Sequence, residues 1–88
     1  CGPAFVQMFI EGLSDGGVYA GLPRNIATEL AARTLLGSAK LLLESGKNPI
    51  ELKDAVCSPR GTTIRGVAAL EKNGLRGACL ECIDEIMK

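Results

Sequence analysis

Histidine and tryptophan are absent from this 88-residue chain, and three aromatic residues occur, namely Phe5, Phe9 and Tyr19. Without histidine the chain cannot form the Ser–His or Cys–His pair on which much nucleophilic catalysis depends. Because aromatic side chains are scarce, burial falls to Ala, Leu, Ile and Val, which suit closely packed helices. The absences therefore exclude histidine-dependent catalytic triads and favour a helical interior.

An excess of positive charge is also lacking. Ten Lys and Arg residues balance ten Asp and Glu residues, so the formal net charge is zero, and no basic run occurs. Binding to nucleic acid needs a cationic face, so it is disfavoured. Residues 3–10 are apolar except for Gln7, but Glu11 and Asp15 end that run long before it could cross a bilayer. We expect neither nucleic acid nor a membrane as a partner.

Paired metal-binding cysteines are missing as well. Cys79 and Cys82 form a CxxC motif, but Cys1 and Cys57 lie far from it and from each other. A structural zinc site needs two such closely spaced pairs. Cys79 and Cys82 fall on the apolar face of the last expected helix, where a reduced cysteine behaves as a small hydrophobic residue. The sequence predicts no metal site and a reducing compartment.

Apolar residues, by contrast, are abundant for so short a chain, at 47% of the total. A chain of this length buries only about 60–65% of its unfolded surface, so the excess apolar surface needs a partner. Segment 23–44 supports the same reading, because its polar residues fall in one narrow stripe and its other positions are mostly apolar or small. We therefore expect the chain to form a homodimer.

The periodicity of the apolar residues predicts an all-α fold, a bundle of about five helices. Gly46 suits the left-handed position after the second helix, and Asn48-Pro49-Ile50-Glu51 is close to a capping box that opens the third. Gly12, Gly16 and Gly17 in the first helix predict that another helix crosses closely there, in preference to a kink. No alternation typical of strands occurs. The predicted helices are 3–20, 23–44, 49 to 57 or 58, 62–73 and 75–87.

Segment 58–63 holds the highest density of candidate ligand-binding groups. Ser58, Thr62 and Thr63 supply three hydroxyls, and Gly61 lets a ligand approach the backbone closely. Amides of Gly61, Thr62 and Thr63 at a helix start could hold a carboxylate or phosphate, aided by the helix dipole. The alternative is structural, because the same residue types make plain turns and N-caps. Neither a P-loop lysine nor a glycine-rich turn after a strand is present, so we expect no nucleotide site in these residues.

Three groups of residues, in order and with compatible spacing, resemble the C-terminal domain of pyrroline-5-carboxylate reductase. The first group is Cys1-Gly2-Pro3-Ala4-Phe5, Glu11-Gly12-Leu13-Ser14-Asp15-Gly16-Gly17-Val18 and Gly21-Leu22-Pro23. The second is Leu52-Lys53-Asp54-Ala55-Val56-Cys57-Ser58-Pro59 with Gly61-Thr62-Thr63-Ile64, and the third is Gly74-Leu75-Arg76-Gly77. The resemblance covers essentially the whole chain, and such an ordered set is far more specific than one short motif.

The resemblance implies an oxidoreductase that reduces 1-pyrroline-5-carboxylate to L-proline with NADPH or NADH, the last step of proline biosynthesis. It implies that residues 1–88 are one C-terminal domain for dimerisation and substrate binding, intertwined with a second copy in a dimer that could assemble further. An N-terminal Rossmann domain, absent from this chain, would bind the cofactor, so these residues alone would be inactive. The compartment implied is the cytoplasm, or the mitochondrion in a eukaryote.

The resemblance also implies roles for particular residues. Ser58, Gly61, Thr62 and Thr63 would bind the substrate carboxylate, and the Thr63 hydroxyl, the catalytic group, would lie near the imine nitrogen as a hydrogen-bond partner or proton relay. The family usually has glycine where this chain has Arg60, and a non-glycine residue is strained if that position needs a positive φ. The alternative function is a non-catalytic helical homodimerisation module.

Overall fold

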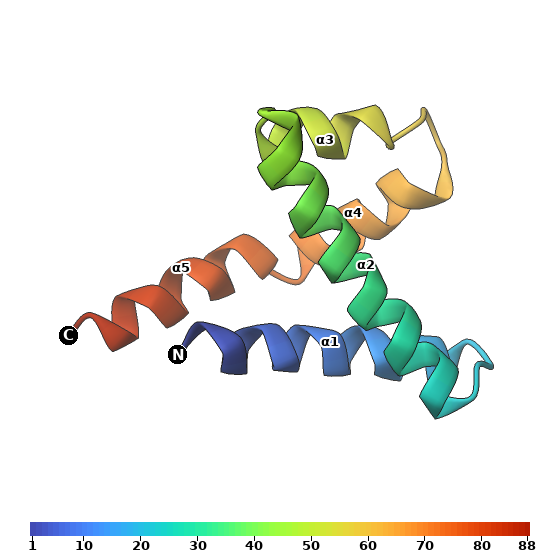
Figure 1. The fold of residues 1–88 in the computed structure, drawn as a ribbon, viewed down its shortest axis with the longest axis horizontal. Helices are drawn as coiled ribbons and strands as arrows, with labels where there is room; N and C mark the ends of the chain where they lie inside the picture. The colour runs from blue at the N-terminus through green and yellow to red at the C-terminus, as the bar shows by residue number, and fades with distance from the viewer. The chain divides into compact units, whose positions relative to one another are not determined.

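The computed structural model describes residues 1–88 and contains five α-helices and no strand (Figure 1). In chain order the helices are α1 (Gly2–Tyr19), α2 (Arg24–Ser45), α3 (Pro49–Ala55), α4 (Thr62–Lys72) and α5 (Leu75–Ile86). The prediction of an all-α fold with five helices is confirmed. The chain divides into two compact units, residues 1–47 and residues 48–88, and each is described by itself.

The helix ends lie within one residue of their predicted positions except at the end of α3. The predicted end at residue 57 or 58 is wrong, because α3 stops at Ala55. The N–H groups of Val56 and Cys57 donate to carbonyls only three residues earlier, at 3.2 Å each, and these tight bonds close the last turn. Proline restricts mainly the residue directly before it, so Pro59 does not fix a helix end several residues upstream.

Helices α1 and α2 form the first unit and cross closely at small residues. A Cβ built on Gly17 would lie 2.9 Å from the Cβ of Ala27, closer than real Cβ atoms approach one another. The predicted close crossing is therefore confirmed at Gly17. At Gly12 and Gly16 an added Cβ would meet nothing within 4 Å in the same chain, because neighbouring residues of a helix point in different directions, so a close crossing at these two glycines stays a prediction.

Glycine, proline and asparagine mark the boundaries of the helices as predicted. Gly46 follows α2 with φ 70°, the left-handed conformation that ends many helices. Asn48 and Glu51 form the predicted capping box at the start of α3. The Glu51 N–H donates to Oδ1 of Asn48 at 2.9 Å, and the Asn48 N–H donates to Oε1 of Glu51 at 3.5 Å. The α2–α3 boundary is thus fixed by local chemistry alone.

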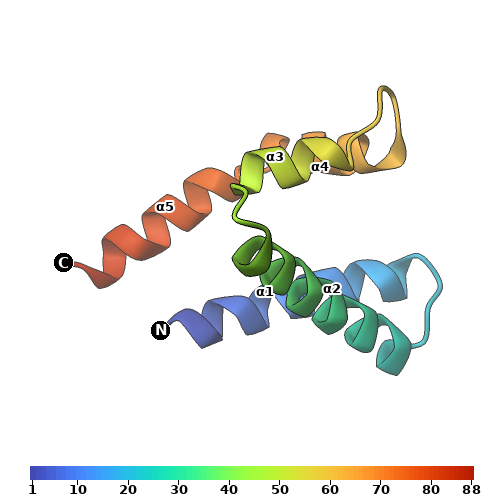
Figure 2. The same ribbon diagram turned by 45° about the horizontal axis from the view of Figure 1, so that its top comes forward.

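Helices α3, α4 and α5 form the second unit. The connection from α3 to α4 is the longer of its two loops, and Figure 2 shows it from a second side. Gly74, with φ 76°, makes the shorter connection between α4 and α5, which contact each other. None of the residues in these three helices is buried.

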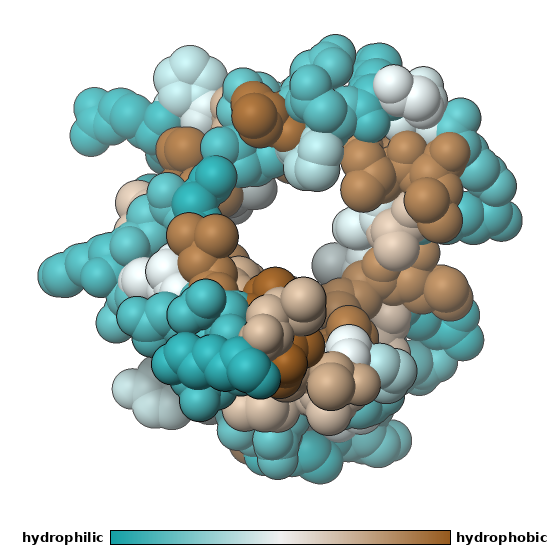
Figure 3. Space-filling view, turned by 90° about the vertical axis from the view of Figure 1, so that its left-hand side faces the viewer, coloured by the Kyte–Doolittle hydropathy of each residue, from teal (hydrophilic) through white to brown (hydrophobic).

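Large apolar side chains remain exposed in both units. The buried residues are Ser14, Ala27 and Ala31, all in α1 and α2. Leu36 and Leu43 of α2 are 67% and 84% exposed, and hydrophobic residues, coloured brown, are visible on the molecular surface in Figure 3. None of the five helices has both the length and the hydropathy needed to cross a membrane. The core that the chain makes by itself is therefore very small.

Candidate functional site

The candidate loop begins with a tight turn made by Ser58, Pro59, Arg60 and Gly61. The Gly61 N–H donates to the carbonyl of Ser58 at 3.0 Å, which closes the turn. Proline in the second position and a positive φ in the third are the pattern of a type II turn, because proline presets the first dihedral angle. The sequence Ser-Pro-Arg-Gly thus folds this way locally, and it aims the chain into α4.

Arg60 is the one residue other than glycine with a positive φ, at 58°. The strain anticipated for this position is therefore present in the structure. For an L-residue the left-handed conformation costs about 1 kcal/mol or more, since Cβ crowds the neighbouring carbonyl oxygen. Glycine or asparagine would occupy this place in the turn more easily.

Free backbone donors gather at the start of α4. Gly61 is the N-cap residue, and its carbonyl accepts the first helical hydrogen bond from the Arg65 N–H at 3.4 Å. No side chain caps this end, so the N–H groups of Thr62, Thr63 and Ile64 have no partner in the chain. These three amides, together with the positive end of the helix dipole, suit a carboxylate or a phosphate oxygen.

This arrangement changes which amides are available compared with the prediction from sequence. Thr62 and Thr63 offer free N–H groups as expected, whereas the Gly61 N–H is used inside the turn. The Ile64 N–H is free and was not anticipated, although counting three residues from the N-cap would have identified it. The predicted helix start at residue 62 was correct, but sequence alone did not show that the turn uses the Gly61 N–H, and this shifts the set of donors by one residue.

Gly61 has a steric role in the loop. A Cβ built on Gly61 would collide with Oγ of Ser58 and would lie 3.2 Å from the Ser58 carbonyl oxygen. The structure thus brings Ser58 and Gly61 into direct proximity, next to the first turn of α4. Ser58, Thr62 and Thr63 are exposed, and none of their hydroxyls forms a hydrogen bond within the chain. The hydroxyls are therefore free for a ligand.

The electrostatic setting of the loop is positive. Segment 55–70 contains Arg60 and Arg65 and no acidic residue. Neither arginine forms an ion pair, whereas Asp54, just before the segment, lies 3.8 Å from Nζ of Lys53. A small anion at the start of α4 would meet amide donors and free hydroxyls, in a segment that carries two unpaired positive charges and no negative one.

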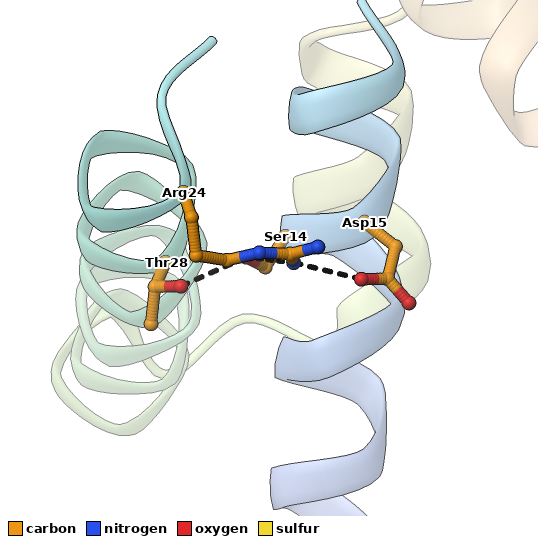
Figure 4. Close-up of polar contacts among 4 residues, drawn as sticks. All are labelled: Ser14, Asp15, Arg24 and Thr28. Atoms are coloured by element: carbon orange, nitrogen blue, oxygen red, sulfur yellow. Dashed lines mark hydrogen bonds and ion pairs between the residues drawn. The ribbon is translucent and has the colours of Figure 1, made fainter.

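A second polar cluster lies between α1 and α2 and was not predicted from the sequence (Figure 4). Ser14 is only 2% exposed, and its Oγ lies 2.8 Å from Oγ1 of Thr28. Nη1 of Arg24 donates to Oγ of Ser14 at 2.9 Å and to Oδ1 of Asp15 at 2.7 Å. A polar residue inside the apolar face of the first helix was the available signal, but its partners depend on how α2 folds back.

This cluster serves mainly to hold the two helices together. It borders an open hollow of about 510 Å³ that is lined by Gln7, Ile10, Glu11, Ser14, Asp15, Arg24 and Thr28. The strongest donor there, Arg24, is already neutralised by Asp15. Every buried polar side-chain atom of the chain has a hydrogen-bond partner, so no orphaned group calls for a ligand in this hollow.

The four cysteines are free thiols. Cys82 Sγ contacts the carbonyl oxygen of Cys79 one helical turn earlier, at 3.2 Å. No three side chains of the metal-ligating types come together anywhere in the structure. The loop at Ser58–Thr63 is therefore the strongest candidate for a binding site.

Residues 1–88 match the family model described as pyrroline-5-carboxylate reductase dimerisation. A pyrroline-5-carboxylate reductase of Synechocystis sp. is 56% identical over 82 residues, which are 93% of this chain and 31% of that protein. The Escherichia coli enzyme of the same name is 49% identical over 86 residues, 98% of this chain and 32% of that protein. The chain thus spans about a third of the length of these relatives.

Solved structures give the same result. The fold is similar to that of Plasmodium falciparum pyrroline carboxylate reductase with NADP bound, with a TM-score of 0.93 and 38% identity. That similarity covers 97% of this chain and 34% of the Plasmodium chain. A reductase from Streptococcus pyogenes is similar with a TM-score of 0.91 and 42% identity, over 94% of this chain and 32% of that one.

Proposed function

Because the chain belongs to the pyrroline-5-carboxylate reductase family, as its dimerisation domain over residues 1–88, we propose that it is the dimerising and substrate-binding part of such an enzyme. The complete polypeptide would reduce 1-pyrroline-5-carboxylate to L-proline with NADPH or NADH. The observation that carries the proposal is the pairing of free amides and hydroxyls at the start of α4 with family membership over the full chain. A plain homodimerisation module would have no use for that loop.

The loop fits the carboxylate of the substrate. The N–H groups of Thr62 and Thr63 would donate to its oxygens, and the Ser58 hydroxyl would add a third donor. Gly61 would contribute through its missing side chain, which leaves room for Ser58 beside the helix start. Binding by several convergent donors fixes the orientation of the ring, and orientation is the main service that such a domain offers.

The Thr63 hydroxyl would lie near the imine nitrogen of the bound ring. Reduction adds a hydride to the imine carbon and a proton to the nitrogen, and a nicotinamide cofactor supplies the hydride when bound. Thr63 would donate a hydrogen bond to the imine nitrogen or relay a proton to it. Its role would thus be confined to that one atom of the substrate. No residue of this chain is proposed to bind the cofactor.

The cofactor is assigned to a domain outside these residues. The five helices contain no strand and no glycine-rich turn after a strand, so they do not fit the dinucleotide-binding pattern. We propose that an N-terminal Rossmann domain of the same polypeptide holds NADPH or NADH. The isolated residues 1–88 should then bind a partner copy and turn over nothing.

The free thiols fit the cytoplasm, which we propose as the compartment.

A homodimer, intertwined through the apolar faces of its helices, is the proposed assembly. The exposed leucines of α2 would be covered by the second copy, and full burial of one such side chain contributes about 1.5–3 kcal/mol. In light scattering at micromolar concentration, a dimer would give a mass of twice the chain. A larger oligomer would give a higher multiple. A stable, well-folded monomer would contradict the proposed interface.

The test of activity uses the full-length polypeptide that contains these residues. Purified protein should consume NADPH or NADH when 1-pyrroline-5-carboxylate is added, and L-proline should accumulate in equal amount. A preparation that binds the cofactor and forms the dimer, yet makes no proline from this substrate, would contradict the proposed activity. That result would not contradict the proposed dimerisation.

A further inference from the structure

Two free thiols lie one turn apart in the middle of α5. Cys79 is exposed and Cys82 is half-buried, and neither is in a disulfide. The Cys82 thiol donates to the carbonyl oxygen of Cys79 at 3.2 Å, so its sulfur points back toward the turn that holds Cys79. Cys1 and Cys57 stand alone in the sequence. The chain thus has one pair of thiols that a single helix brings together.

The spacing of this pair permits a disulfide, but only if the helix is distorted. A disulfide joins Cα atoms about 4.4–6.8 Å apart and Cβ atoms about 3.5–4.5 Å apart. Residues three positions apart on a regular helix have Cα atoms about 5 Å apart, which fits, and Cβ atoms about 5–6 Å apart, which does not. Closing a bond between Cys79 and Cys82 therefore draws the Cβ atoms together by about 1 Å, and α5 cannot stay regular at that turn.

The same turn carries the apolar stripe of α5. Leu75, Cys79, Cys82 and Ile86 follow one another at steps of four, three and four residues, so they lie on one face of the helix. None of them is buried within the chain, and Ile86 is 46% exposed. In the proposed homodimer a second copy would cover such a face. A distortion between Cys79 and Cys82 would move Ile86 relative to Leu75 and spoil the fit.

We propose that Cys79 and Cys82 are a redox-sensitive pair, whose disulfide forms in the unassembled chain and weakens the homodimer. The inference rests on the dimer of the proposed function and adds a control over its assembly. The reduced helix fits the partner copy and the oxidised helix does not. By linkage, assembly must then protect the two thiols from oxidation to the same extent as oxidation weakens assembly.

The oxidant is a low-molecular-weight disulfide, which reacts with the pair by thiol–disulfide exchange. The exposed Cys79 loses its proton, and its thiolate attacks one sulfur of the oxidant and releases one small thiol. The Cys82 thiolate then attacks the Cys79 sulfur of the mixed disulfide and releases the second small thiol. Two protein thiols thus give up two electrons and two protons, and the oxidant is reduced to two thiols. A strained disulfide of this kind is readily reduced, as suits a transient bond in a reducing compartment.

The test treats the full-length enzyme with oxidised glutathione, alkylates the remaining thiols and digests the protein with trypsin. Cleavage after Arg76 and Lys88 releases peptide 77–88, which contains Cys79 and Cys82 and no other cysteine. This peptide should carry no label and should be lighter than its unlabelled reduced form by two hydrogens. Less of the disulfide should form when the protein is kept far above the dissociation constant of the dimer.

Analytical ultracentrifugation of the same samples measures the dissociation constant of the dimer. Oxidation should raise it about tenfold or more, because displacing one buried aliphatic side chain is enough for such a change. Dithiothreitol should restore both the thiols and the dimer. Cys57→Ser is the matched control, since it removes a thiol outside the pair and should respond as the wild type does. The double variant Cys79→Ala, Cys82→Ala should keep its dimer in oxidised glutathione.

Four results would overturn the inference. Peptide 77–88 with both thiols labelled after oxidation would show that the pair does not close. An unchanged dissociation constant in the oxidised enzyme would remove the effect on assembly. A covalent dimer would place the bond between two copies. Loss of the dimer in oxidised Cys79→Ala would assign the effect to glutathione attached to one thiol.

None of these measurements uses the substrate. An enzyme without activity on 1-pyrroline-5-carboxylate would therefore overturn the proposed reaction and leave the thiol pair standing. A reduced wild-type enzyme that stays monomeric would overturn the proposed dimer and this inference with it.

Discussion

Ser58 and Thr63 lie five residues apart, yet their expected contributions fall on different kinetic constants. The Ser58 hydroxyl would act on binding of the substrate carboxylate, whereas the Thr63 hydroxyl would act at the imine nitrogen, where the proton arrives. Both depend on the turn that the Gly61 N–H closes onto Ser58, because this turn sets the direction in which α4 begins. Single side chains can therefore be tested one at a time against a shared backbone.

Thr63→Ala in the full-length enzyme should lower kcat by about 10- to 100-fold, since a positioned proton donor contributes roughly this much or more. The KM for NADPH should stay at the wild-type value, because no residue of this loop is proposed to bind the cofactor. Thr63→Ser keeps a hydroxyl and should retain most of the activity. A Thr63→Ala enzyme with the wild-type rate would remove Thr63 from the mechanism.

Ser14→Ala should destabilise the protein by about 0.5–1.5 kcal/mol, because it removes the hydrogen bonds that the buried Ser14 hydroxyl forms with Thr28 and Arg24. Chemical denaturation at a fixed protein concentration measures this change. Ser38→Ala is the control, since Ser38 is exposed on α2 and the change should stay within about 0.5 kcal/mol. Equal effects of the two substitutions would show that the Ser14 cluster carries no stability.

At the scale of the helices, the decisive contact is the crossing of α1 and α2. It is set by the absence of a side chain at Gly17 and by the smallest possible one at Ala27. The neighbouring turn, with Gly21 at φ 111°, reverses the chain and brings the two helices together. Overpacking such a crossing forces the helices apart, and this typically costs about 1–3 kcal/mol.

Gly17→Ala should therefore lower the free energy of unfolding relative to Gly16→Ala, by about 1–3 kcal/mol. Both substitutions gain the same helix propensity, so their difference isolates the crossing. Adding Ala27→Gly to Gly17→Ala should recover part of the loss, and a double-mutant cycle measures that coupling. Additive effects of the two substitutions would argue against direct contact at this point.

The helices could be predicted closely from the sequence because their ends are marked by local chemistry. Gly46, Asn48 with Glu51, and Gly74 act within a few residues of themselves, so no knowledge of the fold is needed to read them. The end of α3 was missed, because hydrogen bonds to carbonyls three residues earlier close it before Pro59 takes effect. Glycine and capping residues are strong local evidence for where a helix ends, but they do not show how the last turn of that helix closes.

The candidate site was only partly predictable. Ser58, Thr62 and Thr63 were identified from residue type, and the structure places them around one helix start. The use of the Gly61 N–H inside the turn depends on the conformation of residues 58–61, which residue type does not fix. The free Ile64 N–H follows from counting three residues from the N-cap, a step that was not taken. The cluster around Ser14 requires the pairing of residues up to 14 apart on two helices, so it emerges only from the packed unit.

For the molecule as a whole, the very small core argues that folding and association are coupled. Two alanines and a serine are buried, while many large apolar side chains are exposed in both units. If a second copy covers those side chains, the midpoint temperature of unfolding must depend on concentration, since mass action links the two processes.

The midpoint temperature of the isolated domain should therefore rise by several degrees between low and high micromolar concentration, roughly as expected when each tenfold step contributes about 1.4 kcal/mol. Circular dichroism melts over a dilution series measure the shift, and light scattering on the same samples reports the mass. A midpoint independent of concentration, with a monomer mass, would contradict the coupling.

The smallness of the buried core has a consequence for how this sequence can change over time. Substitutions at positions that look solvent-exposed in one chain, such as Leu36 and Leu43, would be purged as strictly as those in an ordinary interior. Each such change would strike two symmetry-related places at once, because both copies carry it. The sequence should thus vary most slowly at positions that a single subunit would expose to water. Among related sequences, the positions that vary least should therefore mark the surface covered by the second copy.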